Sequence, residues 1–176
     1  MPLTKIKSLG ITDGTITSAD LAAGVGAGKF ESALFHVRDE KAVTNAGGGS
    51  TSGSFLTRTL NTSVTNEISG ASLASNQITL PSGTYYIQAA VPFRGDNATQ
   101  TKLRNITDSS DTIIGTATGP NGSDGVSFIN GRFTIAAQKT FEIQYRVATS
   151  RATDGLGSVA SFVTGVFTEV QIWKVA

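Results

Sequence analysis

The sequence predicts an all-β protein, built as an antiparallel sandwich or jelly roll. About eight or nine segments have strand character, no alternation of strands with helices appears, and only one weak helical turn is found. The composition agrees, because Gly, Ser, Thr and Asn are abundant whereas Glu and Lys are scarce. With 176 residues, the chain is long enough for one sandwich with its own core and a short extension.

The first 29 residues are predicted to form an extended arm, followed by a head domain over 30–176. Apolar residues in the arm are sparse and lie between Gly and Thr, so they are too few to close a core. We therefore expect them to dock on another molecule. The candidate docking residues are Leu9, Ile11, Ile16 and Leu21.

The head is expected to begin with a strand over 33–39, in which Phe35 and Val37 share one face. A Gly- and Ser-rich loop is predicted at 45–54, because this composition is typical of loops between strands. The further predicted strands are 55–61, 84–93, 100–106, 111–117, 126–136, 140–147 and a terminal strand within 162–176. Asn130-Gly131 fits a two-residue hairpin turn, because both residues tolerate positive φ.

Two central strands show the clearest alternation of apolar and polar residues. One face of 84–93 carries Tyr85, Ile87, Ala89, Val91 and Phe93. One face of 140–147 carries Phe141, Ile143, Tyr145 and Val147. A period of two is typical of a strand with one buried face, so these nine residues are predicted core.

The terminal strand is expected to belong to the core rather than to a disposable tail. Its alternation assigns Val166, Val170 and Ile172 to the core face. The opposite face then carries Phe167, Glu169, Gln171 and Trp173. A Trp and a Phe on that face need cover, from elsewhere in the chain or from another copy, and this favours a self-associating domain. A one-residue slip would exchange Trp173 for Ile172.

Charge and cysteine content exclude several classes of function. Charged residues make up 15% of the chain and nearly balance at a net charge of +1, so neither nucleic acid nor an anionic membrane surface is an expected partner. The chain has no Cys, which excludes disulfides and thiolate chemistry and favours synthesis in the cytosol. No apolar run reaches the roughly 20 residues of a membrane span, and no cleaved secretion signal is expected.

Three pieces of the head, in this order and spacing, resemble the complement globular-head and tumour-necrosis-factor family. They are ESALFHV at 31–37, PSGTYYIQAAV at 81–91 and FVTGVFTEVQIWKV at 162–175. The resemblance implies a ten-stranded jelly roll that assembles as a homotrimer, with the terminal strand in the inner sheet. That arrangement would cover Trp173. The chain lacks the collagen-like stalk found in animal members of the family, which argues against a secreted animal protein.

The arm has a resemblance of its own. SLGITDGTITSADLA at 8–22 is similar to short linkers near the N-termini of tailed-bacteriophage fibre, spike and head-decoration proteins. Those linkers attach or trimerise a C-terminal head. The resemblance therefore implies a virion protein whose arm docks on a neighbouring subunit.

No catalytic, cofactor or metal site is predicted. His36 has no second His and no Cys to join it, so an ordinary strand or interface residue is expected there rather than a catalytic base or metal ligand. No Gly-x-Ser-x-Gly motif marks a nucleophile. Four loop residues could offer oxygen ligands to Ca²⁺, but turn formation is the favoured explanation for them: Asp108, Asp111, Asn121 and Asp124.

The aromatic residues predicted on the outward faces are Tyr86, Phe167 and Trp173. Three interpretations are open for them: a seam between subunits, a ligand groove, or simple exposure. In a trimeric jelly roll the seam is favoured.

These observations predict a bacteriophage structural protein without enzymatic activity. As a homotrimeric capsid decoration (cement) protein, it would sit on the capsid surface and bind the major capsid protein through its arm. As a tail fibre or receptor-binding protein, it would attach to a tail adaptor and recognise a host glycan through the polar loops 94–99, 108–111 and 119–125. A secreted, non-viral trimeric binding module is the third alternative.

Overall fold

The computed structural model describes residues 33–95, 98–119, 123–159 and 161–175. The chain divides into two units, Met1–Glu31 and Ser32–Ala176, and the described residues all belong to the second. The predicted docking arm, with Leu9, Ile11, Ile16 and Leu21, lies outside the described residues. The arm and its boundary at residue 29 therefore stay predictions.

The described part of the chain is all-β. Its strands are β1 (Ala33–Lys41), β2 (Leu56–Thr57), β3 (Thr62–Asn66), β4 (Ser72–Ala74), β5 (Gln77–Leu80), β6 (Gly83–Arg94), β7 (Thr99–Asn105), β8 (Ser110–Ile114), β9 (Asp124–Ile135), β10 (Lys139–Val147) and β11 (Gly165–Lys174). No helix in this part of the chain is long and apolar enough to cross a membrane.

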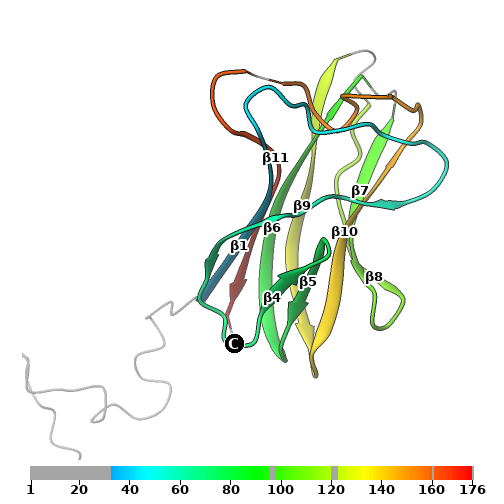
Figure 1. The fold of residues 1–176 in the computed structure, drawn as a ribbon. Coiled ribbons are helices and arrows are strands. Elements are labelled where there is room, and N and C mark those ends of the chain that lie inside the picture. Colours follow the sequence, from blue (N-terminus) through cyan, green and yellow to red (C-terminus); the bar gives the residue numbers. More distant parts are fainter. Residues whose placement is uncertain (1–32, 96–97, 120–122, 160, 176) are drawn as a thin grey trace, which may run out of the picture. The chain divides into compact units, whose positions relative to one another are not determined.

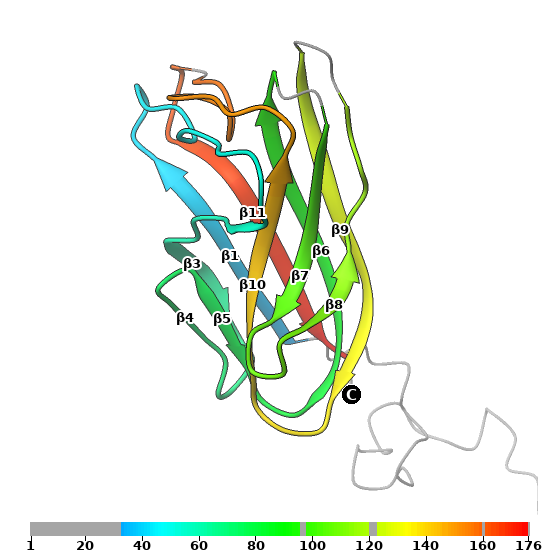
Figure 2. The same ribbon diagram turned by 90° about the vertical axis from the view of Figure 1, so that its right-hand side faces the viewer.

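The strands form two antiparallel sheets that pack face to face as a jelly-roll sandwich (Figures 1 and 2). The first sheet has the order β3-β1-β11-β6-β9, so the first and last long strands of the head are neighbours. The second sheet has the order β4-β5-β10-β7-β8, and β2 pairs with β10 at its side. From β5 onward the chain passes repeatedly from one sheet to the other, as a jelly roll requires. The predicted fold class is confirmed.

The core lies between the sheets and is built from the two alternating patterns described above. On β6 the five predicted core residues are at most 1% exposed, and on β10 the four predicted core residues are at most 4% exposed. Successive side chains of a strand point to opposite faces, so the residues between them face outward. Burial of these rings and branched chains supplies the main driving force for folding the head.

Strand β11 departs from the predicted alternation at one point. Val170 and Ile172 are fully buried, as predicted, but Val166 is 41% exposed and Phe167 only 5% exposed. The pairing with β1 explains this, because Asp39 lies opposite Thr168 while Glu40 lies opposite Val166, with Phe167 as an extra residue between them. Such a bulge reverses which side chains face inward. The predicted faces of Val166 and Phe167 are therefore wrong.

The predicted hairpin at Asn130-Gly131 is also wrong. Strand β9 runs without a break through both residues, which lie opposite Gln88 and Ile87 of β6. Gly131 occupies an inward position where Ile113 of β8 fills the space, since a Cβ at Gly131 would stand 3.0 Å from the Cδ1 atom of Ile113. The glycine accommodates packing between the sheets, not a turn.

One charged side chain is completely buried at the end of the sandwich where β11 begins. Arg58, between β2 and β3, donates from Nε to Thr168 Oγ1 (2.9 Å) and from Nη2 to the carbonyls of Phe167 (2.8 Å) and Leu156 (3.1 Å). Its guanidinium also lies 5.3 Å from the ring centroid of Phe93. These contacts tie the long connection between β10 and β11 to the core.

Candidate functional site

The outward face of the first sheet, which we call the assembly face, begins with an apolar row near the C-terminus of β11. The cross-strand register places Leu34 of β1, Trp173 of β11 and Tyr86 of β6 side by side. The rings of Tyr86 and Trp173 lie 6.1 Å apart between centroids, and Tyr86 remains 43% exposed. A tilted aromatic pair at this distance is a favourable contact that still offers apolar surface to a partner.

The opposite end of the assembly face is apolar as well. Val166, Pro92 and Val126 form a row across β11, β6 and β9, and Phe128 follows Val126 on the same face of β9. Val126, Phe128 and Val166 are each between 40% and 43% exposed. Single exposed apolar residues are ordinary, but two apolar rows on one sheet face indicate a surface that contacts another protein.

Between these ends lies a band of uncharged polar residues. Gln171, Gln88 and Asn130 stand opposite one another on β11, β6 and β9. Next to them, a hollow of about 110 Å³ is lined by Gln88, Ala90, Phe128, Glu169 and Gln171. Amides desolvate more easily than charges and form hydrogen bonds in any orientation, so a band of this kind suits a protein interface.

His36 lies on the assembly face and contacts one acidic residue. Its Nε2 atom is 2.8 Å from Glu169 Oε1, and its side chain is 13% exposed. No group of three or more His, Cys, Asp or Glu residues in the described part of the chain could hold a metal ion. The prediction that His36 is an ordinary strand or interface residue stays a prediction.

Of the three predicted interface aromatics, the structure brings together only Tyr86 and Trp173. Phe167 lies inside the head, where its ring packs against the backbone of Gly47, Gly157 and Gly165. Its predicted place on the outward face is corrected by the bulge in β11. Val126, Phe128 and Val166 were missed as candidates, although the register of β6 with β9 would have identified the first two.

The candidate calcium ligands belong to ordinary turns and ion pairs. The Asp108 carboxylate accepts a hydrogen bond from the side-chain amide of Asn105 and pairs with Lys139, while Asp111 pairs with Lys102 and Arg104. The hydrogen bond from Lys102, followed by that from Arg104, outweighs the effect of burial and lowers the pKa of Asp111. Asp124 pairs with Arg94 at 3.9 Å and accepts from Ser158, and Asn121 lies outside the described residues.

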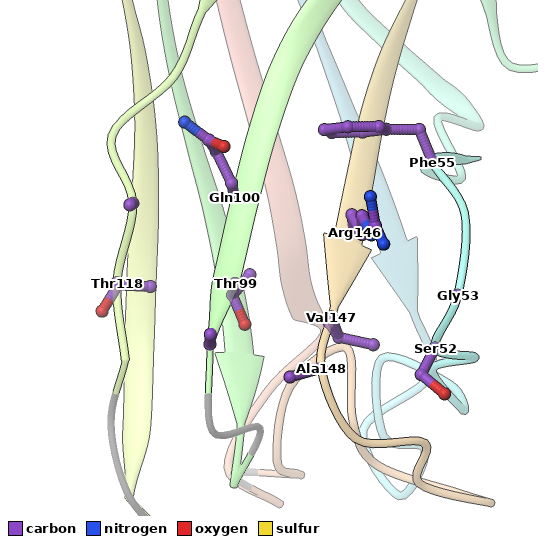
Figure 3. A pocket seen from close by; sticks show the side chains of 11 residues that line it. Ser52, Gly53, Phe55, Thr99, Gln100, Thr118, Arg146, Val147 and Ala148 are labelled. Atoms are coloured by element: carbon purple, nitrogen blue, oxygen red, sulfur yellow. The ribbon is translucent and has the colours of Figure 1, made fainter.

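The outward face of the second sheet carries a separate feature, an open groove of about 520 Å³. One wall comes from the loop before β2, with Ser52, Gly53 and Phe55 (Figure 3). The other wall is the segment after β8, with Ala117 and Thr118. The floor comes from β7, β10 and the residues that flank them: Ala98, Thr99, Gln100, Arg146, Val147 and Ala148. Among the described residues of the loops predicted to bind sugar, only Ala98 and Thr99 line this groove.

Comparison with solved structures supports the jelly-roll assignment. The crystal structure of murine APRIL is matched with a TM-score of 0.54 and 9% identity, over 82% of this chain and 99% of that chain. The globular domain of zebrafish complement 1qA protein is matched with a TM-score of 0.54 and 12% identity, over 83% of this chain and 98% of that chain. No protein-family model and no curated protein matches the sequence. At these identities the likeness shows the fold: a tumour-necrosis-factor-like, complement-head-like jelly roll.

Proposed function

We propose that this chain is a homotrimeric bacteriophage structural protein, a capsid decoration (cement) protein that stabilises the head through its N-terminal arm. The observation that carries the trimer is the assembly face. Tyr86 and Trp173 at one end and Val126, Phe128 and Val166 at the other are apolar, partly exposed and on one sheet face. A second copy is the partner that such a face fits, because the family that the sequence resembles trimerises through this sheet.

The arm supports the virion assignment. The segment 8–22 is similar to phage linkers, and its apolar residues are too widely spaced to form a core of their own. In the proposed assembly, three arms extend from one trimer to major capsid protein subunits. Each arm places residues such as Leu9, Ile11, Ile16 and Leu21 against the shell, and no enzymatic step is involved.

The mechanism of stabilisation is linkage between binding and shell integrity. A trimer that binds several assembled capsid subunits, but not the separated ones, adds its binding free energy to the stability of the shell. Three weak arm contacts on one trimer also act together, because the second and third bind at a high effective concentration. The capsid surface is the localisation that this mechanism requires.

We expect virions that lack this protein to adsorb to cells normally but to release their DNA at a lower temperature, or under milder osmotic shock, than complete virions. Adding back the purified full-length protein should restore the release temperature. The measurement is a fluorescent-dye assay of DNA release on heating. Particles as heat-resistant as complete ones that fail to adsorb would contradict the cement role.

That contrary result would favour the second candidate, a tail fibre or receptor-binding protein attached to a tail adaptor. The groove on the second sheet is the observation that favours it, since a receptor-binding tip needs a ligand site that faces away from its own trimer interface. The number of copies of the protein per virion distinguishes a capsid decoration protein from a tail fibre. A decoration protein is present in hundreds of copies, whereas a fibre is present in a few dozen at most.

We expect deletion of residues 1–29 to abolish attachment to the virion while leaving the head folded and trimeric. The first strand of the described residues begins at Ala33, so the deletion leaves every described strand in place. Sedimentation of particles mixed with the full-length or the truncated protein, followed by gel quantification, measures the occupancy. Normal occupancy by the truncated protein would show that the head itself makes the docking contacts.

A further inference from the structure

The groove on the second sheet contains a basic residue, Arg146, for which the described residues supply no counter-ion. The other basic residues that face outward from this sheet are paired: Lys102 and Arg104 with Asp111 at 2.9 and 2.8 Å, and Lys139 with Asp108 at 2.5 Å. Arg146 is exposed on β10 and forms no ion pair or side-chain hydrogen bond within the described residues. None of the described residues that line the groove is acidic, so the positive charge of Arg146 favours an anionic ligand there.

The surroundings of Arg146 offer both apolar and hydrogen-bonding surface. Gln100 lies opposite Arg146 in the pairing of β7 with β10. On the other side, the pairing of Leu56 with Tyr145 continues to Phe55, and Figure 3 shows the Phe55 ring next to Arg146. The small side chains of Ala98 and Ala148 leave the floor open.

The polar groups of the walls favour a ligand that is rich in hydroxyl groups. Gln100 donates a long hydrogen bond to the carbonyl of Gly115 (3.4 Å), which leaves its amide oxygen as an acceptor for a ligand. Hydroxyl groups of Ser52 and Thr118 stand on opposite walls. Strand β7 offers no open edge to an extended peptide here, because it pairs with β10 on one side and Thr99 bridges Thr118 on the other.

We propose that this groove binds an acidic saccharide, a pyranose unit that carries a carboxylate, as in acidic surface polysaccharides. The guanidinium of Arg146 receives the carboxylate in a two-point contact, which its planar geometry favours. One face of the Phe55 ring is occupied by the Lys102 ammonium, whose Nζ atom lies 4.0 Å from the ring centroid, so the sugar packs against the remaining apolar surface of the ring. Gln100 exchanges hydrogen bonds with the hydroxyl groups of the sugar. The groove volume falls within the range of about 300–1,000 Å³ that is usual for small-molecule sites.

This site does not depend on whether the protein is located on the capsid or on the tail of a virion. Its location on the second sheet leaves the assembly face on the first sheet free. A ligand could therefore bind whether or not the chain trimerises or docks on a capsid. Failure of the proposed function and failure of this inference are consequently separate results.

The test is a titration of the full-length, ¹⁵N-labelled protein followed by NMR. The probes are the methyl glycosides of D-glucuronic acid and N-acetylneuraminic acid, with methyl glucoside and sodium acetate as neutral and sugar-free controls. We expect either acidic glycoside to shift the amide signals of Gln100, Arg146 and Ala148 with saturable, millimolar-range affinity. Methyl glucoside lacks the carboxylate that contacts Arg146, and acetate lacks the sugar ring that contacts Phe55 and Gln100. Each should therefore bind at least about ten-fold more weakly.

Two substitutions complete the test. Arg146→Gln should weaken binding of the acidic glycoside about ten-fold, whereas Arg104→Gln, which removes the same charge from the same sheet outside the groove, should leave it unchanged. Ala148→Trp should block the groove while the other amide signals keep their positions, which shows that the variant is folded.

Three results would overturn the inference. They are an absence of shifts around the groove, equal affinity of wild type and Arg146→Gln, and binding of acetate or of an acidic peptide as tightly as the glycosides.

Discussion

Arg58→Ala is expected to lower the free energy of unfolding of the head by about 3–5 kcal/mol, the cost of breaking a buried charged network. The substitution removes the donors for the carbonyls of Leu156 and Phe167 and for Thr168 Oγ1, all in the interior. It also leaves Asp39, which is 1% exposed, without the attraction of the guanidinium. Burial lowers the pKa of Arg58 to about 10, and the negative charge of Asp39 opposes part of that shift.

The expected loss is a large fraction of the stability of a domain, which is typically about 5–15 kcal/mol. Equilibrium unfolding in urea, followed by Trp fluorescence, measures it. Arg104→Ala is the matched control, because that guanidinium lies on the surface in a pair with Asp111. Its removal should lower the free energy of unfolding by about 1 kcal/mol or less. An Arg58→Ala protein as stable as the Arg104→Ala protein would show that the buried network contributes nothing.

Trp173→Ala is expected to shift the protein from trimer toward monomer. In the head alone the Trp173 ring is half-buried and contacts Tyr86, and in the proposed trimer both rings become covered. Truncating an aromatic residue at the centre of an interface costs about 2 kcal/mol or more. Because a closed trimer repeats each interface, the loss applies three times per assembly.

The control for this variant is Ile114→Ala. Ile114 is 57% exposed and belongs to β8, at the edge of the second sheet, so its removal takes away apolar surface without touching the assembly face. Size-exclusion chromatography with light scattering over a range of concentrations should show a lower trimer fraction for Trp173→Ala only. Equal trimer fractions for the two variants would place the seam elsewhere.

The alternation of residues along strands was enough to predict the sandwich and most of its core. Tyr85, Ile87, Phe141 and Ile143 are buried because β6 and β10 are regular strands, where a period of two is a reliable guide. The same rule failed at Phe167, because a bulge inserts one residue and exchanges the two faces. Nothing in the local sequence marks that bulge, since it depends on the partner strand.

Tertiary contacts also explain the wrong hairpin prediction at Asn130-Gly131 and the burial of Arg58, about which the sequence made no prediction. Asn130-Gly131 has the local preferences of a turn, but the pairing of β9 with β6 overrides them and the glycine makes room for Ile113. Arg58 has no sequence feature that distinguishes it from a surface arginine, and only the folded head surrounds it with carbonyls. Tertiary contacts therefore decided both positions.

One of the two candidate sites could be predicted in part from the sequence, and the other could not. Tyr86 and Trp173 were each predicted on an outward face, because apolar and polar residues alternate clearly in their strands. The structure adds that the two rings are neighbours. The groove was not predicted, because it combines residues from the loop before β2, from β7 and β10 and from the segment after β8. Chain segments so far apart in sequence meet only through the sheet topology, which alternation does not specify.

The measurement that tests the central claim most directly is the mass of the full-length protein in solution. Sedimentation velocity at micromolar concentration should give a single species with three times the 18.2 kDa mass of the chain. Trp173→Ala should reduce that species at the same concentration. A single folded monomer across the whole concentration range would contradict the claim that the assembly face joins copies of this chain.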